Sequence, residues 1–285
     1  MIKEAHLFLT TECNLRCKYC FVENNCTKAE TMPEEVSDRA MEYISNELPE
    51  GVTVEFFGGE PLLQFGLIKR IIEARPMLKY VMPTNCLLMD DEKYEFFRNH
   101  RDFVTVTLSL DGDVATHVAN RGQFPDINML KKMSSGLRTN IRMVVENPKN
   151  LYEDVKFLAG LGTQNINISA PLMYVPQSGY KEELKRQLAL VLSDKPLSLR
   201  VSLPTLNVGT SSCRAATEEI CIAPNGDIYP CDIFYLKGEF KIGDIYTGID
   251  TQKEDEFSTF IIKYNAPDIP CKAHQCYLGG RWIND

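Results

Sequence analysis

The segment HLFLTTECNLRCKYC, residues 6–20, joins a short apolar run to three closely spaced cysteines. The run HLFLT (6–10) has the length and composition of a buried β-strand, and Cys13, Cys17 and Cys20 follow it directly. In parallel α/β folds, functional groups gather in the loops that leave the carboxyl ends of the strands. The segment therefore predicts an α/β fold whose first loop carries a group of thiols.

Further strand candidates follow this segment, separated by amphipathic stretches. They are TVEFF (53–57), KYVMPT (79–84), VTVTLSL (104–110), IRMVV (141–145) and NINIS (165–169). Several are apolar at consecutive positions, as expected for strands that are covered on both faces. Six strand–helix units in series predict a parallel sheet with right-handed crossovers, and six is fewer than the eight of a closed barrel. The expected fold is a partial (β/α)6 TIM-like barrel over residues 1–196.

Local signals mark where some of these elements begin or turn. Thr31, Pro33 and Glu34 resemble a capping box with proline near the first turn, which predicts the start of a helix. After residue 197 the pattern changes to short strands and turns. There ICIAPNGDIYPC (220–231) predicts a hairpin, with Asn225-Gly226 supplying the positive φ angles of a tight turn. Residues 197–285 are expected to form a small second module.

Composition excludes several classes of protein. The net charge of −8 disfavours a nucleic-acid partner, because such affinity comes mainly from lysine and arginine. The N-terminus lacks a signal peptide, and no apolar run is long enough to span a bilayer, so a cytoplasmic protein without a membrane partner is expected. Disulfides rarely persist in reducing cytosol, so clustered thiols are interpreted as metal ligands or catalytic groups. Eight of the ten cysteines fall in two groups, at 13–20 and 213–276, and Cys26 and Cys86 lie outside them.

Cys13, Cys17 and Cys20 form a group of three without a fourth cysteine directly beside them, and this number bears on which metal they could bind. Structural zinc is usually closed by four ligands, and Cys26 is the one other cysteine near this group in the sequence. A [4Fe-4S] cluster held by three cysteines instead leaves one iron open to a non-protein ligand. Zinc and redox thiols are the alternatives.

The C-x3-C-x2-C pattern after a first strand, with an aromatic residue before the last cysteine, resembles the radical S-adenosylmethionine (SAM) enzymes. The resemblance implies that Cys13, Cys17 and Cys20 hold a [4Fe-4S] cluster whose open iron binds SAM. It also implies that reductive cleavage of SAM yields a 5'-deoxyadenosyl radical, with an electron from a reductant such as flavodoxin or ferredoxin.

Two more motifs resemble the same family. GGEP (58–61) is similar to its motif for the SAM amino group, and SLDG (109–112) with the following DGDVATHVANRG is similar to a stretch of peptide maturases and anaerobic sulfatase maturases. His117 in that stretch is expected to be a structural hydrogen-bonding residue. The SAM-binding residues that the resemblance implies are Tyr19, Gly58, Gly59, Glu60, Ser109, Arg121 and Ile168. Each has an ordinary structural alternative, such as a core contact or an ion pair.

A second group of cysteines lies in the C-terminal module. The spacing from Cys213 through Gly226 to Cys231 resembles the SPASM and twitch extensions of radical SAM enzymes, which carry auxiliary Fe-S clusters. The resemblance favours one auxiliary [4Fe-4S] cluster held by four cysteines, and zinc is the alternative. The expected ligands are Cys213, Cys231, Cys271 and Cys276. Cys221 is interpreted as a buried small residue, a replacement ligand or a hydrogen-atom donor.

Asp232 follows Cys231 directly, and the resemblance to sulfatase maturases implies that it is a catalytic base; a backbone hydrogen bond is the alternative. Together these features predict a radical SAM enzyme that abstracts hydrogen from a peptide or small-protein substrate, leading to a cross-link, an epimerised residue or an oxidised residue. A twitch-type small-molecule dehydrogenase, similar to the aminocyclitol enzymes, is the alternative within enzymes. A non-catalytic Fe-S or zinc protein is the alternative outside them.

Overall fold

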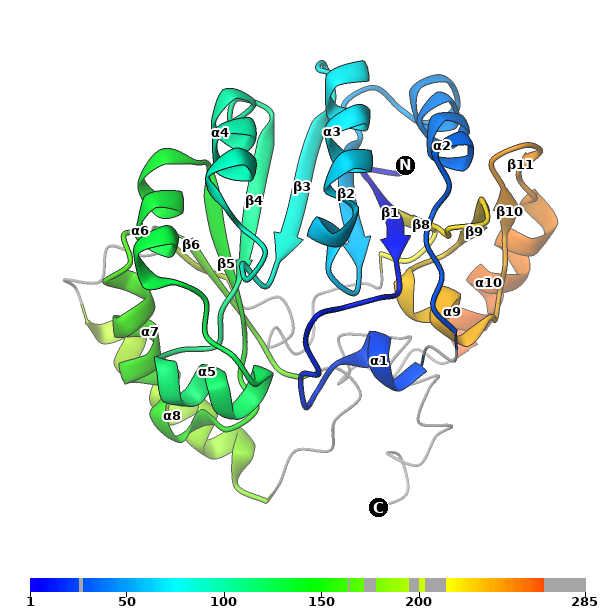
Figure 1. The fold of residues 1–285 in the computed structure, drawn as a ribbon. Coiled ribbons are helices and arrows are strands. Elements are labelled where there is room, and N and C mark those ends of the chain that lie inside the picture. The colour runs from blue at the N-terminus through cyan, green and yellow to red at the C-terminus, as the bar shows by residue number, and fades with distance from the viewer. Residues whose placement is uncertain (26–27, 164, 172–177, 195–199, 203–213, 264–285) are drawn as a thin grey trace. The chain divides into compact units, whose positions relative to one another are not determined.

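The computed structural model describes residues 1–25, 28–163, 165–171, 178–194, 200–202 and 214–263 (Figure 1). Its contacts divide the chain into two compact units. Unit 1 contains the described residues within Met1–Asn14, Phe21–Pro83 and Val208–Asp285, and unit 2 contains those within Leu15–Cys20 and Thr84–Asn207. The C-x3-C-x2-C segment therefore contributes Cys13 to unit 1 and both Cys17 and Cys20 to unit 2.

Unit 1 is built around a sheet that starts with the first strand of the chain. Its strands are β1 (Glu4–Thr10), β2 (Thr53–Gly58), β3 (Lys79–Thr84, of which Thr84 falls in unit 2), β8 (Glu219–Ile222), β9 (Asp227–Tyr229), β10 (Gly243–Asp244) and β11 (Gly248–Ile249). Its helices are α1 (Phe21–Asn25), α2 (Glu34–Glu47), the 3-10 helix η1 (Pro61–Gln64), α3 (Phe65–Ala74), α9 (Asp232–Lys237) and α10 (Thr251–Lys263).

β1 lies between two parallel neighbours, β2 and β8. Every residue from Ala5 to Thr10 is buried, as expected for a strand that is covered on both faces. Side chains alternate between the faces, so His6 and Phe8 share one of them. The Phe8 ring contacts Tyr235 of α9 at 4.7 Å, which places α9 against this face.

The predicted hairpin is present as β8 and β9, which pair antiparallel with Cys221 opposite Tyr229. Its turn differs from the expected one, because Gly226 has a positive φ of 88° and Asn225 does not. The Gly226 N–H donates to the Ala223 carbonyl at 2.9 Å, the i to i+3 bond of a type I turn with Pro224 at its second position. One left-handed residue after such a turn is enough to close a three-residue hairpin loop.

The capping box expected before α2 is wrong. Pro33 is the N-cap residue and provides no side-chain cap. The Thr31 hydroxyl lies 3.1 Å from the Thr10 hydroxyl instead, and the two residues form an isolated β-bridge. The Thr31 hydroxyl, which the local pattern predicted to cap the helix, therefore contacts Thr10 of β1.

Unit 2 contains a second run of parallel strands in the order β4, β5, β6, β7. Its strands are β4 (Val104–Ser109), β5 (Thr139–Val144), β6 (Asn165–Ser169) and β7 (Arg200–Ser202). Its helices are α4 (Asp91–Asn99), α5 (Val114–Arg121), α6 (Ile127–Gly136), the 3-10 helix η2 (Pro148–Asn150), α7 (Leu151–Ala159) and α8 (Tyr180–Ser193). Apolar strand residues such as Leu108, Ile141 and Ile166 are fully buried.

The α/β class with a parallel sheet is confirmed, and each of the six predicted strands is present within about two residues of its predicted ends. β7 and β8 were not predicted as members of the parallel sheet. The boundary at residue 196 and the cysteine-rich module stay predictions. In the part of the chain that the structure describes, no helix combines the length and apolar character that a membrane crossing requires.

Candidate functional site

Asp111, directly after β4, is the centre of a buried polar cluster in unit 2. Its side chain is fully buried and accepts hydrogen bonds through both oxygens. Oδ1 accepts from Arg121 Nη2 at 2.8 Å and from the Val144 backbone N–H at 3.1 Å. Oδ2 accepts from the Tyr19 hydroxyl and from Asn120 Nδ2 at 3.4 Å. A buried carboxylate requires this degree of pairing, since an unpaired one would be costly to bury.

The Asp111 cluster, defined as Asp111 with Tyr19, Asn120 and Arg121, anchors the loop that carries two of the three motif cysteines. Besides the Tyr19 hydroxyl bond, the Lys18 N–H donates to the Asn120 carbonyl at 3.0 Å. Within the loop the Cys20 N–H donates to the Cys17 carbonyl at 3.1 Å, which closes a tight turn. The C-terminal end of α5 therefore holds the segment Leu15–Cys20 at both backbone and side chain.

Arg121 places a permanent positive charge beside this loop. Its guanidinium carbon lies 5.5 Å from the centre of the Tyr19 ring, within the range of a cation–π contact. Burial opposes its charge, but Asp111, Tyr19 and Cys17 raise the pKa of Arg121 above its usual value. Burial also raises the pKa of Tyr19, so the phenol remains a donor to Asp111. The predicted SAM-binding pair Tyr19 and Arg121 is thus brought together around a shared carboxylate.

His117 supports the backbone of the Asp111 cluster. The Asp111 N–H donates to His117 Nδ1 at 3.4 Å. Burial, followed by the nearby charge of Arg121, lowers the pKa of His117 to about 4. The ring is therefore neutral at pH 7 and can accept this bond. This geometry agrees with the structural role expected for His117.

Gly112 has a φ of +142°, and an added Cβ would come within 2.2 Å of Asp154 Oδ1. The Asp154 carboxylate accepts from the Asp113 N–H at 2.9 Å. The turn after β4 therefore needs glycine for both its φ angle and its close approach to α7. This turn sets the direction in which α5 leaves the sheet.

Two other predicted SAM-binding residues lie on strands of unit 2. Ser109 ends β4, is partly exposed and pairs in register with Arg142 of β5. Ile168 lies in β6 opposite Met143, and its side chain is fully buried. A ligand would therefore meet the backbone of Ile168 rather than its side chain.

In unit 1 the GGEP loop after β2 clamps the backbone just before Cys13. The Gly59 N–H donates to the Thr10 carbonyl at 2.8 Å, and the Glu60 N–H donates to the Glu12 carbonyl at 2.9 Å. A Cβ at Gly58 would lie 2.0 Å from the Thr10 oxygen, and one at Gly59 would lie 2.1 Å from the Glu12 oxygen. The glycines are needed for this approach of backbone to backbone. We call residues 10–12 with 58–60 the glycine clamp.

Glu60, at the end of the glycine clamp, is almost completely buried. Its Oε1 accepts from the Leu62 N–H at 3.1 Å, so the side chain caps η1. This contact fixes where the carboxylate lies. It leaves the predicted charge interaction with an ammonium group untested.

Asp232, the predicted base, begins α9 and is buried in unit 1. Its Oδ2 lies 2.8 Å from His6 Nδ1, and its Oδ1 is buried without a hydrogen-bond partner. The backbone hydrogen bond weighed as its alternative role is not its main contact, which is with the imidazole. Cys221 is completely buried nearby, and burial together with the Asp232 charge raises the pKa of its thiol.

The described part of the chain contains Cys13, Cys17, Cys20, Cys86, Cys221 and Cys231, and none of these is in a disulfide. The three motif cysteines are partly exposed, whereas Cys231 is buried at the N-cap of α9. Three partly exposed thiols after the first strand are a donor set that fits an Fe-S cluster. Cys213, Cys271 and Cys276, the other predicted auxiliary ligands, lie outside the described residues, as does Cys26.

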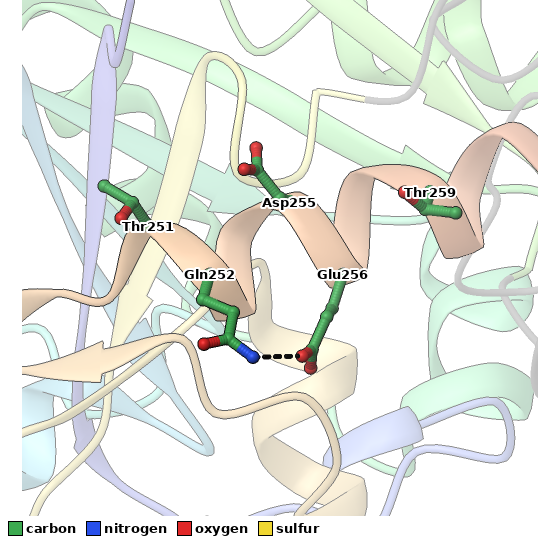
Figure 2. Close-up of a pocket in the computed structure, with 5 residues that line it drawn as sticks. All are labelled: Thr251, Gln252, Asp255, Glu256 and Thr259. Carbon is green, nitrogen blue, oxygen red and sulfur yellow. Dashed lines mark hydrogen bonds between the residues drawn. The ribbon is translucent and has the colours of Figure 1, made fainter.

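A hollow in the described residues lies on α10 (Figure 2). Its lining residues are Thr251, Gln252, Asp255, Glu256 and Thr259. All come from this one helix, and Gln252 donates to Glu256 at 3.1 Å. It contains none of the predicted site residues and resembles an open helix surface rather than an enclosed binding site.

Two residues of the candidate site were missed from the sequence. Asp111 was quoted within SLDG without a role, and its DG pair at a strand end was the available signal. His6 lies inside the first strand, where a histidine among apolar residues was the available signal. Tyr19, which binds Asp111, and Asp232, which binds His6, come from segments far away in the chain, so a local pattern does not show either arrangement in full.

The sequence is similar to one family model and to several curated proteins. The model of the radical SAM superfamily matches residues 7–114. An uncharacterised protein of Methanocaldococcus jannaschii is 30% identical over 182 residues, covering 58% of this chain and 62% of the relative. A cysteine-type anaerobic sulfatase-maturating enzyme of Clostridium novyi is 24% identical and covers 83% of this chain and 74% of the relative. The subtilosin biosynthesis protein AlbA of Bacillus subtilis is 21% identical, covering 84% and 56%.

Solved structures give the same fold. A structure of anSMEcpe with bound AdoMet and a Cp18Cys peptide superposes with a TM-score of 0.74 at 18% identity, covering 99% of this chain and 98% of that one. Streptococcus suis SuiB bound to the precursor peptide SuiA gives a TM-score of 0.72 at 18% identity, covering 90% and 65%. The chain spans 62% and 32% of the lengths of the first two curated relatives.

Proposed function

We propose that the chain, whose residues 7–114 match the model of the radical SAM superfamily, is a radical SAM enzyme that modifies a peptide or small protein. The observation that carries the proposal is the pair of supports around the cysteine motif. The glycine clamp holds the backbone before Cys13, and the Asp111 cluster holds the segment of Cys17 and Cys20. Each unit thus holds its own part of the motif backbone in place, which suits residues that serve as ligands.

Cys13, Cys17 and Cys20 would hold the [4Fe-4S] cluster. When bound, the cluster supplies the electron for reductive cleavage of SAM to a 5'-deoxyadenosyl radical. The cluster sites of proteins reach potentials as low as about −700 mV, depending on charge and burial. The charge of Arg121 beside Cys17 stabilises thiolate ligands electrostatically.

For SAM itself, we assign the residues named from the sequence. Glu60 would pair with the amino group, and the backbone of Gly58 and Gly59 would approach the ligand. Ser109 would contact the ribose, and Tyr19 with the backbone at Ile168 would lie along adenine. Arg121 would reach SAM through Nε, which is buried and without a hydrogen-bond partner, while Nη2 remains on Asp111.

The substrate class is proposed from the relatives. The sulfatase-maturating enzyme and the subtilosin biosynthesis protein are matched over more than four fifths of this chain. A peptide or small protein is therefore the proposed substrate.

Asp232 would act as the base through Oδ1, which is left open when Oδ2 binds His6. Cys213, Cys231, Cys271 and Cys276 would hold an auxiliary cluster. A flavodoxin or ferredoxin would deliver the electrons, and the cytoplasm would be the compartment.

The first test concerns SAM cleavage. The chain is reconstituted with iron and sulfide without oxygen and incubated with SAM and dithionite. We expect 5'-deoxyadenosine from the parent and from Cys86→Ala, and none from Cys17→Ala. Cys86 is the control because it is a buried thiol of unit 2 that belongs to neither predicted set of cluster ligands. Absence of 5'-deoxyadenosine from iron-loaded parent protein would favour a non-catalytic metalloprotein.

The second test concerns the substrate. Short synthetic peptides that contain cysteine, serine or threonine are added to the same reaction, and their masses are measured. Loss of two hydrogens reports oxidation or cross-linking, and uptake of one solvent deuterium reports epimerisation. Turnover of an aminocyclitol with all peptides unchanged would support the small-molecule dehydrogenase instead.

A further inference from the structure

His6 has one ring nitrogen satisfied and one that is buried without a partner. Nδ1 lies 2.8 Å from Asp232 Oδ2, whereas Nε2 has no hydrogen-bond partner. The residue is only 8% exposed, so solvent does not readily replace the missing partner. The nearest ion-pairing oxygen, Glu4 Oε2, is 3.8 Å from Nε2, which is too long for a hydrogen bond.

Glu4 and Glu219 complete a set of potential ligands around this nitrogen. One ligand atom from each of Glu4, His6 and Glu219 lies within 4.8 Å of the others. Two nitrogen or oxygen ligands of a tetrahedral zinc ion, each about 2.0–2.2 Å from it, lie about 3.3–3.6 Å apart. The 3.8 Å between His6 Nε2 and Glu4 Oε2 is close to this spacing, and rotation of the glutamate side chains by about 1 Å would bring all three atoms onto a shared cation. The separation of 3.8 Å is long for a hydrogen bond but suitable for an intervening ion.

The other contacts of His6 are those that metal-binding histidines usually have. A metal-ligating imidazole nearly always uses its second nitrogen to bind a carboxylate or carbonyl, which fixes the ring and its tautomer. Asp232 provides that carboxylate. The His6 ring also stacks on Phe57, with centroids 5.5 Å apart and planes 11° from parallel. The imidazole is thus held in place with Nε2 directed toward the acidic side chains.

The charges around His6 favour a cation. Glu55 is paired with His6 in the β1–β2 register and is buried, which adds a further carboxylate to Glu4, Glu219 and Asp232. Burial raises the pKa of Glu219 to about 7, as expected for a carboxyl group short of positive charge. Burial opposes the charged form of His6, but Asp232, Glu4 and Glu55 raise its pKa, so a proton on Nε2 competes with the metal.

Arg214 is the existing cation near the cluster. It binds Glu4 Oε2 at 2.9 Å and Glu218 at 3.2 Å, but its side chain is 41% exposed. It therefore approaches Glu4 from the solvent side and can move away. Its presence predicts competition with a metal for Glu4.

We propose that Glu4, His6 and Glu219 form a binding site for a divalent transition ion of the zinc class, with water in the fourth position. Imidazole with carboxylates is a donor set that zinc accepts. Glu4 and His6 lie on β1 and Glu219 lies on β8, so the ion would cross-link two neighbouring strands. The proposal shares Asp232 with the proposed function, where this residue is the base, but it involves neither SAM nor the motif cysteines, so zinc binding can be measured separately from SAM cleavage.

The test uses the full chain with its Fe-S clusters reconstituted, treated with a chelator and titrated with Zn²⁺. We expect one zinc ion per chain in the parent and in Glu218→Gln. Binding should weaken by about tenfold or more in His6→Gln and Glu219→Gln. Glu218 is a matched control because it is the adjacent carboxylate and pairs with Lys3 and Arg214. Arg214→Gln should bind zinc more tightly than the parent, because a competing charge is removed.

Two further measurements distinguish zinc bound at Glu4, His6 and Glu219 from zinc bound by cysteines. X-ray absorption at the zinc edge should give nitrogen or oxygen neighbours at about 2.0–2.1 Å rather than sulfur at about 2.3 Å. Zinc should raise the Tm of the parent and of Glu218→Gln but not of Glu219→Gln, a conservative change that keeps the shape of the side chain. Equal zinc isotherms for the parent and Glu219→Gln, or a shell of sulfur alone, would overturn the proposal.

Discussion

Asp111 forms the buried ion pair with Arg121 in unit 2, so its substitution is expected to affect stability strongly. Removing one partner of a buried ion pair costs about 3–5 kcal/mol, because the other charge remains buried without compensation. We expect Asp111→Asn to lower the free energy of unfolding by about 3 kcal/mol and to reduce the iron retained after reconstitution. Urea unfolding and iron analysis measure these effects.

Asp113→Asn is the control for that substitution. Asp113 caps α5 two residues further on, and asparagine caps helices about as well as aspartate. The double variant Asp111→Asn with Arg121→Gln should recover part of the loss, because the uncompensated cation is removed. Full stability and full iron content in Asp111→Asn would show that Asp111 does not anchor the loop.

His117 predicts a pH dependence of stability. Its folded-state pKa of about 4 lies below the ordinary value of 6.5, so between these values the unfolded chain binds a proton that the folded chain does not. Stability from this group is therefore complete above pH 6.5 and is lost as the pH falls toward 4. A shift of this size corresponds to about 3 kcal/mol. Urea unfolding from pH 7 to pH 4 should show a shallower decline in His117→Asn, and parallel curves would contradict the assignment.

At the scale of elements, the glycine clamp joins the loop after β2 to the loop after β1. Gly59→Ala would force a Cβ to within 2.1 Å of the Glu12 carbonyl, and backbone on both sides leaves no rotamer to relieve the clash. We expect the loop before Cys13 to shift and iron retention to fall several-fold. The measurement is iron and sulfide content after anaerobic reconstitution.

Gly66→Ala is the matched control, because nothing lies within 4 Å of its added Cβ and the residue is inside α3. Alanine there should stabilise the helix by about 0.5–1 kcal/mol. Equal iron retention in Gly59→Ala and Gly66→Ala would show that the clamp does not position the cysteine loop.

The elements also show what a sequence can predict. The six strands were found because apolar runs such as 104–110 and 165–169 carry their own signal. The Thr31 hydroxyl was assigned to the wrong partner, and Asp111 and His6 received no role. The contacts of Thr31 with Thr10, of Asp111 with Tyr19 and of His6 with Asp232 join segments that lie apart in the chain. SLDG drew attention to Ser109, although the fully buried carboxylate two residues later makes the larger number of described contacts. Patterns within one segment predict elements, whereas buried polar pairs depend on the packing of several.

For the whole molecule, the proposed function implies two Fe-S clusters, one that binds SAM and one auxiliary cluster. Cys231 lies in unit 1 at the start of α9 and precedes Asp232, whereas Cys17 and Cys20 lie in unit 2. If both clusters are [4Fe-4S], the reconstituted chain carries about eight iron atoms. Loss of one cluster should then leave about half of the iron.

Cys231→Ala tests this division of tasks. We expect the iron content to fall to about four atoms per chain, since a thiolate ligand of the auxiliary cluster is lost. SAM cleavage without peptide should continue, because Cys13, Cys17 and Cys20 are unchanged, whereas modification of the peptide should stop. Cys86→Ala controls for the removal of a buried thiol and should keep both iron and activity. If Cys231→Ala keeps its full iron content and still modifies the peptide, Cys231 is not a ligand of the auxiliary cluster. Cys221 would then be the next candidate ligand to test.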